Sequence, residues 1–225
     1  MNMDTDCLDV VRAVAFDMDG LLVNTEELYE EVGDRLLQRR GHRMTDDLLT
    51  QMIGRPSRVA LPMMIDWYGL SDSVQQLEEE TESIFMEILP EGLAPMPGIV
   101  ELLHHVERLG LPKVVATSSR LPFAHRVLSQ LEWLPRFEFL LTSESVEHGK
   151  PHPEIYLTAA QRLGVTPAQL LVLEDSHNGC KAAVAAGACA VAVPHRRTSS
   201  HDFTGVRFIA DTAHDPRIRQ LLGEI

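Results

Sequence analysis

Three apolar segments of this 225-residue chain end in side chains that can bind phosphate or a metal ion. They are followed by Asp17-Met18-Asp19-Gly20, by Thr117-Ser118-Ser119 and by Glu174-Asp175-Ser176. Carboxylates this close repel one another unless a hard cation lies between them, and carboxylate oxygens with waters and a phosphate suit Mg²⁺. Hydroxyl and backbone N–H groups in the second set can donate hydrogen bonds to phosphate oxygens. These residue types predict a site that binds a phosphate group together with Mg²⁺.

Lys150 is a further candidate, in the segment Glu147-His148-Gly149-Lys150-Pro151-His152-Pro153. One glycine and two prolines predict a stiff, non-helical loop. A lysine held by such a loop can neutralise both a phosphoryl oxygen and a nucleophilic carboxylate, whereas most lysines are simply exposed. The rigid setting favours the functional interpretation of Lys150.

A parallel sheet is the element that would bring these residues together. Short apolar segments bounded by polar or turn residues are typical of strands buried on both faces, and they occur at residues 13–16, 114–116, 139–141, 170–173 and 190–193. Between them lie stretches predicted to be helical, at residues 99–109, 123–131, 154–163 and 178–186. Alternating strands and helices imply an α/β fold, a doubly wound, Rossmann-like parallel sheet. Its carboxyl edge would collect all the polar sets at one site.

The stretch from residue 23 to residue 90 interrupts this alternation. It contains helix signals alone, with apolar residues recurring at helical spacing in four consecutive groups. We predict a small all-helical cap at residues 23–90, inserted into a core made of residues 1–22 and 91–225. Pro90, Pro95 and Pro97 are expected to mark the return to the core.

Composition restricts the partners and the compartment. The formal net charge is −13, which repels polyanions, so neither nucleic acid nor a membrane surface is an expected partner. A small phosphorylated metabolite is compatible with this net charge.

No segment is long and apolar enough to span a bilayer, and the first residues lack the pattern of a secretory signal. Three cysteines without paired spacing favour a reduced, cytoplasmic setting. A monomer or weak homodimer is expected.

Four ordered motifs resemble those of the haloacid-dehalogenase-like phosphatases. The first is Phe16-Asp17-Met18-Asp19-Gly20-Leu21-Leu22-Val23-Asn24-Thr25-Glu26, and the second is Thr117 after an apolar strand. The third is Lys150 in Gly-Lys-Pro-x-Pro, and the fourth is Leu173-Glu174-Asp175-Ser176-x-x-Gly179. A lone DxDG is a weak signal, but the ordered set spans nearly the whole chain. The helical insert is similar to the cap of the subgroup that contains beta-phosphoglucomutase and many small sugar-phosphate phosphatases.

The resemblance implies a Mg²⁺-dependent mechanism with two catalytic carboxylates. Asp17 would attack phosphorus in line and form an aspartyl-phosphate. Asp19 would protonate the leaving oxygen and then deprotonate the hydrolytic water. Mg²⁺ would be held by Asp17, by the backbone carbonyl of Asp19 and by Asp175, with Glu174 nearby.

The resemblance also implies residues that contact the substrate. Thr117 and Lys150 would balance the charge on the phosphoryl oxygens. The residues themselves add that the backbone N–H of Ser118 or Ser119 can donate to a phosphate oxygen if a helix begins there. Gly20 allows the chain to turn sharply beside the phosphate.

The segment Gly54-Arg55-Pro56-Ser57 matches the cap loop that dips toward the active site in this subgroup. Arg55 is either a substrate contact or an exposed charge at a helix start. The mutases usually carry Val-Ser-Arg or Ile-Ser-Arg here, so this difference favours hydrolysis. The segment Pro194-His195-Arg196-Arg197, after the fifth strand, either adds positive charge near the site or faces solvent.

Three functions remain to be compared. The favoured one is a phosphatase for a small phosphate monoester, and the alternative is a beta-phosphoglucomutase-like isomerase using the same aspartyl-phosphate. A receiver-type signalling module or an inactive relative is the third, but receivers lack a long cap after the first strand. Intact Asp17 and Asp19 argue against an inactive relative. His148 and His152 flank Lys150, yet the mechanism requires neither.

Overall fold

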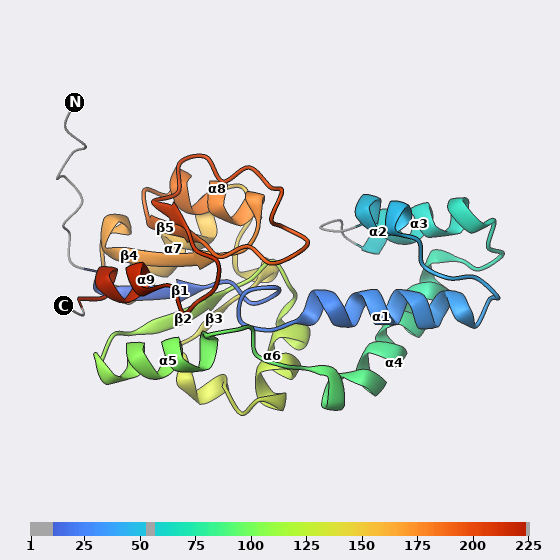
Figure 1. The fold of residues 1–225 in the computed structure, drawn as a ribbon, viewed down its shortest axis with the longest axis horizontal. Coiled ribbons are helices and arrows are strands. Elements are labelled where there is room, and N and C mark those ends of the chain that lie inside the picture. The colour runs from blue at the N-terminus through green and yellow to red at the C-terminus, as the bar shows by residue number, and fades with distance from the viewer. Residues whose placement is uncertain (1–10, 53–56, 224–225) are drawn as a thin grey trace. The chain divides into compact units, whose positions relative to one another are not determined.

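The computed structural model describes residues 11–52 and 57–223 (Figure 1). The chain divides into two compact units, which we call the core unit and the helical unit. The core unit consists of the described chain up to Asn24 and from Ala94 onward, and the helical unit is Thr25–Leu93. The sequence placed these boundaries at residues 22/23 and 90/91. Among the described residues, none of the helices is both long and apolar enough to cross a membrane.

The core unit contains one sheet in which all strands run parallel, in the order β3-β2-β1-β4-β5-β6. The strands are β1 (Ala13–Phe16), β2 (Lys113–Ala116), β3 (Leu140–Leu141), β4 (Leu170–Glu174), β5 (Cys189–Ala192) and β6 (Phe208–Ile209). Every residue of β1, β2 and β4 is buried, as expected for central strands covered on both faces. The predicted doubly wound α/β fold is confirmed, and β6 is an edge strand that the sequence did not reveal.

Helices cover both faces of this sheet. They are α5 (Ile99–Arg108), α6 (Leu121–Gln130), α7 (Glu154–Leu163), α8 (His177–Ala185) and the short α9 (Pro216–Leu221). Figure 1 shows α7 and α8 on one side of the sheet and α5 and α6 on the other. The small residues Ala159 of α7 and Ala183 of α8 belong to one buried cluster with Ala15 of the central strand, and small side chains allow helices to pack closely on a sheet. This close packing fixes the loops at the carboxyl edge of the sheet.

The helical unit consists of α1 (Thr25–Gln38), α2 (Asp46–Met52), α3 (Ser57–Tyr68) and α4 (Val74–Gly92). The predicted stripe of Leu28, Val32 and Leu36 is buried on α1. Ser73 and Gln76 form a capping box at the start of α4, which satisfies two backbone donors there. The described residues of the interval in which only helix signals were found therefore form four helices.

One expectation about this unit is wrong. Pro90 was expected to mark the return to the core together with Pro95 and Pro97, but it lies inside α4. Proline removes the one hydrogen bond that its own N–H would donate, and since α4 ends at Gly92 only two helical residues follow it. The buried neighbours Ile88 and Leu89 keep the turn packed, and the N–H of Leu93 closes it by donating to the carbonyl of Leu89 at 3.1 Å.

Candidate active site

Three adjacent strands of the sheet deliver polar side chains to the same edge. Asp17 directly follows β1, Thr117 directly follows β2, and Glu174 ends β4 with Asp175 next to it. Because β2, β1 and β4 are neighbours in the sheet, residues separated by more than a hundred positions become neighbours in space. All four are buried, so hydrogen bonds and charges between them are only weakly screened by water.

Lys150 lies at the centre of this group. Its Nζ atom donates to Asp17 Oδ1 at 2.5 Å, to Glu174 Oε1 at 2.6 Å and to the carbonyl of Ala116 at 2.8 Å. Only 4% of its side chain is exposed, so the alternative of an exposed surface lysine is wrong. Burial alone would lower the pKa of Lys150, but the carboxylates of Asp17 and Glu174 outweigh burial and raise it well above its usual value. The residue is a fixed cation between two carboxylates.

Glu174 is held on both of its oxygens. Oε1 accepts from Lys150 and from the hydroxyl of Tyr156 at 2.8 Å. Oε2 accepts from the backbone N–H of Ser176 at 3.1 Å and from its hydroxyl at 2.9 Å. The carboxylate occupies the space where a side chain at position 179 would begin, since a Cβ on Gly179 would lie 1.7 Å from Oε1. Glycine in the first turn of α8 is therefore a requirement of the Glu174 position.

A carboxylate cluster forms around Asp17. One carboxylate oxygen from each of Asp17, Glu174 and Asp175 lies within 4.8 Å of the other two. Burial raises the pKa of Asp17 well above its usual value; Lys150 opposes this, while the like charges of Glu174 and Asp175 add to it. The cluster therefore has more negative charge than Lys150 can balance.

This donor set fits Mg²⁺. Oxygen ligands at 2.0–2.1 Å in an octahedron are separated by about 2.9 Å when adjacent and about 4.1 Å when opposite. The oxygens of the carboxylate cluster lie within 4.8 Å of one another, and a divalent cation between them would remove their mutual repulsion. Asp17 and Asp175 are the residues that would hold the ion, with Glu174 beside them.

Asp19 is oriented by two hydroxyl groups. Thr117 Oγ1 donates to Asp19 Oδ2 at 3.1 Å, and Ser119 Oγ donates to the same oxygen at 2.7 Å. The backbone N–H of Ser119 in turn donates to Thr117 Oγ1 at 3.0 Å. Both hydroxyls thus point at the predicted acid–base residue.

The turn after Asp19 requires a glycine. Gly20 has a φ of +79°, and its N–H donates to the carbonyl of Val23 at 2.9 Å. A Cβ at this position would also lie 2.8 Å from Nε2 of His195 and 2.9 Å from Oδ2 of Asp175. The turn thereby brings the backbone of the first motif against the end of β4.

Two candidate substrate contacts, Ser118 and Arg55, stay predictions. The contact of the Ser118 backbone with phosphate depended on a helix beginning there, but α6 begins at Leu121 and Ser118 is exposed. The reason is the bond from Ser119 to Thr117, which closes a tight turn ahead of the helix. Arg55 lies outside the described residues.

Sequence reasoning missed the hydroxyl of Tyr156, which donates to Glu174, and it considered Ser119 as a possible backbone donor and not for the hydroxyl that donates to Asp19. It left open whether the segment at residues 194–197 lies near the site, and His195 of that segment does. His195 Nε2 lies 3.2 Å from Asp175 Oδ2. A tyrosine on the apolar face of a predicted helix was a usable signal, because a buried hydroxyl needs a hydrogen-bond partner.

Comparison with known proteins identifies the family. Residues 11–187 match the family model of the haloacid dehalogenase-like hydrolases. The chain is 36% identical to a phosphorylated carbohydrates phosphatase of Thermotoga maritima, over 79% of this chain and 82% of that protein. It is 33% identical to the validoxylamine A 7'-phosphate phosphatase of Streptomyces hygroscopicus subsp. limoneus, over 85% and 87% of the two chains.

A solved structure agrees with this assignment. A Thermotoga maritima protein proposed to be a beta-phosphoglucomutase superposes with a TM-score of 0.82 at 31% identity, over 93% of this chain and 98% of that chain. The expectation of an enzyme, a phosphoric monoester hydrolase, is confirmed at the level of the family. With its four motifs assembled at the edge of one parallel sheet, the chain belongs to the haloacid dehalogenase-like hydrolases.

Proposed function

We propose that this protein is a Mg²⁺-dependent phosphatase that hydrolyses a small phosphate monoester, a sugar phosphate or a similar metabolite. The observation that carries the proposal is the buried carboxylate of Asp17, fixed by Lys150 and placed beside Asp175. Relatives that act on phosphorylated carbohydrates and on validoxylamine A 7'-phosphate support a polyhydroxylated substrate. A cytoplasmic location and a monomer or weak homodimer belong to the same proposal.

Asp17 acts as the nucleophile. An oxygen of its carboxylate attacks phosphorus, forms an aspartyl-phosphate and breaks the bond to the ester oxygen. Attack requires the ionised carboxylate, which Lys150 favours through its 2.5 Å bond to Oδ1. Bound Mg²⁺ would supply further positive charge to the phosphoryl oxygens and to the carboxylate. The buried setting limits access of competing water before the ester bond breaks.

Asp19 moves the proton in both halves of the reaction. It gives a proton to the leaving ester oxygen, which departs as an alcohol. It then takes a proton from the water that attacks phosphorus, and inorganic phosphate leaves as the Asp17 carboxylate is restored. Thr117 and Ser119 hold the Asp19 carboxylate in one orientation for both transfers.

A beta-phosphoglucomutase-like isomerase is the second candidate, favoured by the likeness to the Thermotoga maritima structure. A mutase uses the same nucleophile but returns the phosphoryl group to a sugar instead of to water. Steady release of inorganic phosphate therefore indicates a phosphatase. Interconversion of sugar phosphates without phosphate release would indicate a mutase.

The test is a phosphate-release screen over small phosphate esters with Mg²⁺, run beside Asp17→Asn and with a chelator. We expect turnover by the wild type, none by Asp17→Asn and none after Mg²⁺ is removed. Circular dichroism should show that Asp17→Asn retains the fold, because the amide replaces the carboxylate at nearly equal volume. Full activity in Asp17→Asn would exclude Asp17 as the nucleophile.

A further inference from the structure

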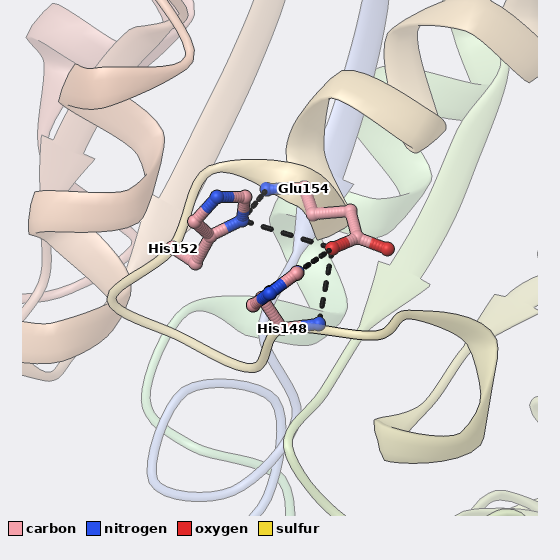
Figure 2. Close-up of side chains that lie close together, drawn as sticks. All are labelled: His148, His152 and Glu154. Carbon is pink, nitrogen blue, oxygen red and sulfur yellow. Dashed lines mark hydrogen bonds and ion pairs between the residues drawn. The ribbon is translucent and has the colours of Figure 1, made fainter.

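The loop that carries Lys150 also carries a second cluster of possible metal ligands. Figure 2 shows the side chains of His148, His152 and Glu154 turned toward one another. Nδ1 of His148 lies 3.0 Å from Oε2 of Glu154, and Nδ1 of His152 lies 3.7 Å from the same oxygen. One ligand atom of each residue lies within 4.8 Å of those of the other two. This cluster has no part in the phosphatase mechanism above.

The loop holds these side chains in place through its own backbone. A turn brings the two histidines side by side, since the N–H of His152 donates to the carbonyl of Gly149 at 3.0 Å. The imidazole rings then stack, with centroids 4.6 Å apart and planes 37° from parallel. Pro151 and Pro153 fix two φ angles of this short segment.

Glu154 ties the two ends of the loop together. Its Oε1 accepts from the N–H of Glu147 at 2.7 Å, and its Oε2 accepts from the N–H of His148 at 3.0 Å. A carboxylate oxygen has two lone pairs, so Oε2 retains capacity for a metal ion in place of the contact with the His148 ring. The three side chains therefore lose little conformational freedom when they bind an ion.

The spacing suits a tetrahedral transition-metal site. At a metal–nitrogen distance of 2.0–2.1 Å, neighbouring ligands of a tetrahedron are about 3.4 Å apart. The two separations from Glu154 Oε2 to the imidazole nitrogens, 3.0 and 3.7 Å, lie on either side of this value. Small rotations of the exposed rings complete the fit, because the side chains of His148 and His152 are 63% and 50% exposed. A bound ion would replace the long 3.4 Å hydrogen bond that His152 Nδ1 accepts from the N–H of Glu154.

We propose that His148 Nδ1, His152 Nδ1 and Glu154 Oε2 form a binding site for a divalent first-row transition-metal ion such as Zn²⁺. Two imidazoles and one carboxylate select such ions over Mg²⁺, which prefers oxygen ligands alone. The fourth position is open to water, so the ion exchanges with solution.

The proposed metal site and the candidate active site share the loop that carries Lys150. Lys150 sits between the two histidines in the sequence and directs Nζ inward to Asp17 and Glu174. An ion bound outside would join residues on both sides of Lys150 and stabilise the loop that positions it. The concentration of transition-metal ions can thereby affect the activity of the enzyme through the position of Lys150.

The test is calorimetric titration of metal-free protein with Zn²⁺ in an excess of Mg²⁺, which occupies the carboxylate cluster. We expect the wild type to bind Zn²⁺ and the affinity to fall more than about tenfold in His148→Ala/His152→Ala. Loss of a residue that only hydrogen-bonds to a metal ligand already lowers metal affinity by about 10–100-fold, and these two histidines would be ligands themselves. The matched control is His104→Ala, which removes another exposed histidine and should bind as the wild type does.

Co²⁺ provides an independent readout. Four-coordinate Co²⁺ absorbs visible light strongly. We therefore expect intense absorption when Co²⁺ binds to the wild type and loss of this absorption in the double variant. If the double variant does not fold by circular dichroism, the single variant His152→Ala takes its place. Zn²⁺ affinity in the variant equal to that of the wild type, or no Zn²⁺ binding by the wild type under Mg²⁺ excess, would overturn the proposal.

Discussion

Gly179→Ala adds a single methyl group where Glu174 leaves no room. The new Cβ would lie 1.7 Å from Oε1, 1.9 Å from Cδ and 2.3 Å from Oε2 of the Glu174 carboxylate. Ordinary contact begins near 3.5 Å, so Oε1 must shift by about 1.8 Å. It cannot shift freely, because Lys150, Tyr156 and Ser176 all hold it.

Two opposing effects decide the size of the change. Displacing Glu174 breaks a buried ion pair with Lys150, which costs about 3 kcal/mol or more. Alanine in place of glycine in a helix returns up to about 1 kcal/mol. The free energy of unfolding should therefore fall by about 2 kcal/mol. Phosphate release should fall as well, because the displaced carboxylate no longer positions Lys150.

Urea denaturation of four proteins measures this coupling: the wild type, Gly179→Ala, Glu174→Ala and the double variant. In the Glu174→Ala background the obstructing carboxylate is gone, so Gly179→Ala should be neutral or stabilising by up to about 1 kcal/mol. Gly149→Ala is the matched control, since its Cβ would meet nothing within 4 Å and should change stability by less than about 0.5 kcal/mol. An equal cost of Gly179→Ala in both backgrounds would refute the reasoning.

Three further substitutions test the site and the core unit. Lys150→Met leaves two buried carboxylates uncompensated, so phosphate release should fall at least about 100-fold and urea denaturation should show a loss of about 3 kcal/mol. Ser119→Ala removes the 2.7 Å bond to Asp19, and we expect kcat to fall about tenfold with less than about 1.5 kcal/mol lost in unfolding. Glu107→Gln tests a pH effect, because the hydrogen bond from Arg136 lowers the pKa of Glu107 to about 2. The wild type should be more stable by about 1 kcal/mol above pH 4.5, where the carboxylate is ionised in both folded and unfolded chains, and denaturation at several pH values should show this advantage disappearing as the pH falls toward 2.

The sequence predicted those elements of the fold that have strong patterns. The strand Ala13–Phe16 is wholly apolar, and α7 ends at Gly164, which adopts a φ of +70° as expected for a helix terminator. The edge strand Phe208–Ile209 escaped detection because it has two residues, one of them 51% exposed. α9 spans only Pro216–Leu221, too few residues to show a helical period.

The site was predictable where it depends on topology and not where it depends on loop conformation. Asp17 and Asp175 could be brought together because each directly follows a strand of the sheet. Nothing in the sequence separates Ser118 from Ser119, yet only a tight turn aims one hydroxyl at Asp19 and leaves the other serine exposed. His195 depends on the path of a loop that the sequence left open.

The hydrogen bonds of Glu174 indicate different roles for Glu174 and its neighbour Asp175. Its two oxygens accept four bonds from protein donors, which fills the four lone-pair positions of a carboxylate. Direct coordination of a metal ion by Glu174 would therefore require one of these bonds to break, in a buried environment where that is costly. The geometry of Glu174 suits the positioning of Lys150, and we therefore expect Asp17 and Asp175 to be the acids that contact the metal ion directly. The need for glycine at position 179 has the same cause. α8 can begin beside Glu174 only if its first turn has no side chain where the Glu174 carboxylate lies.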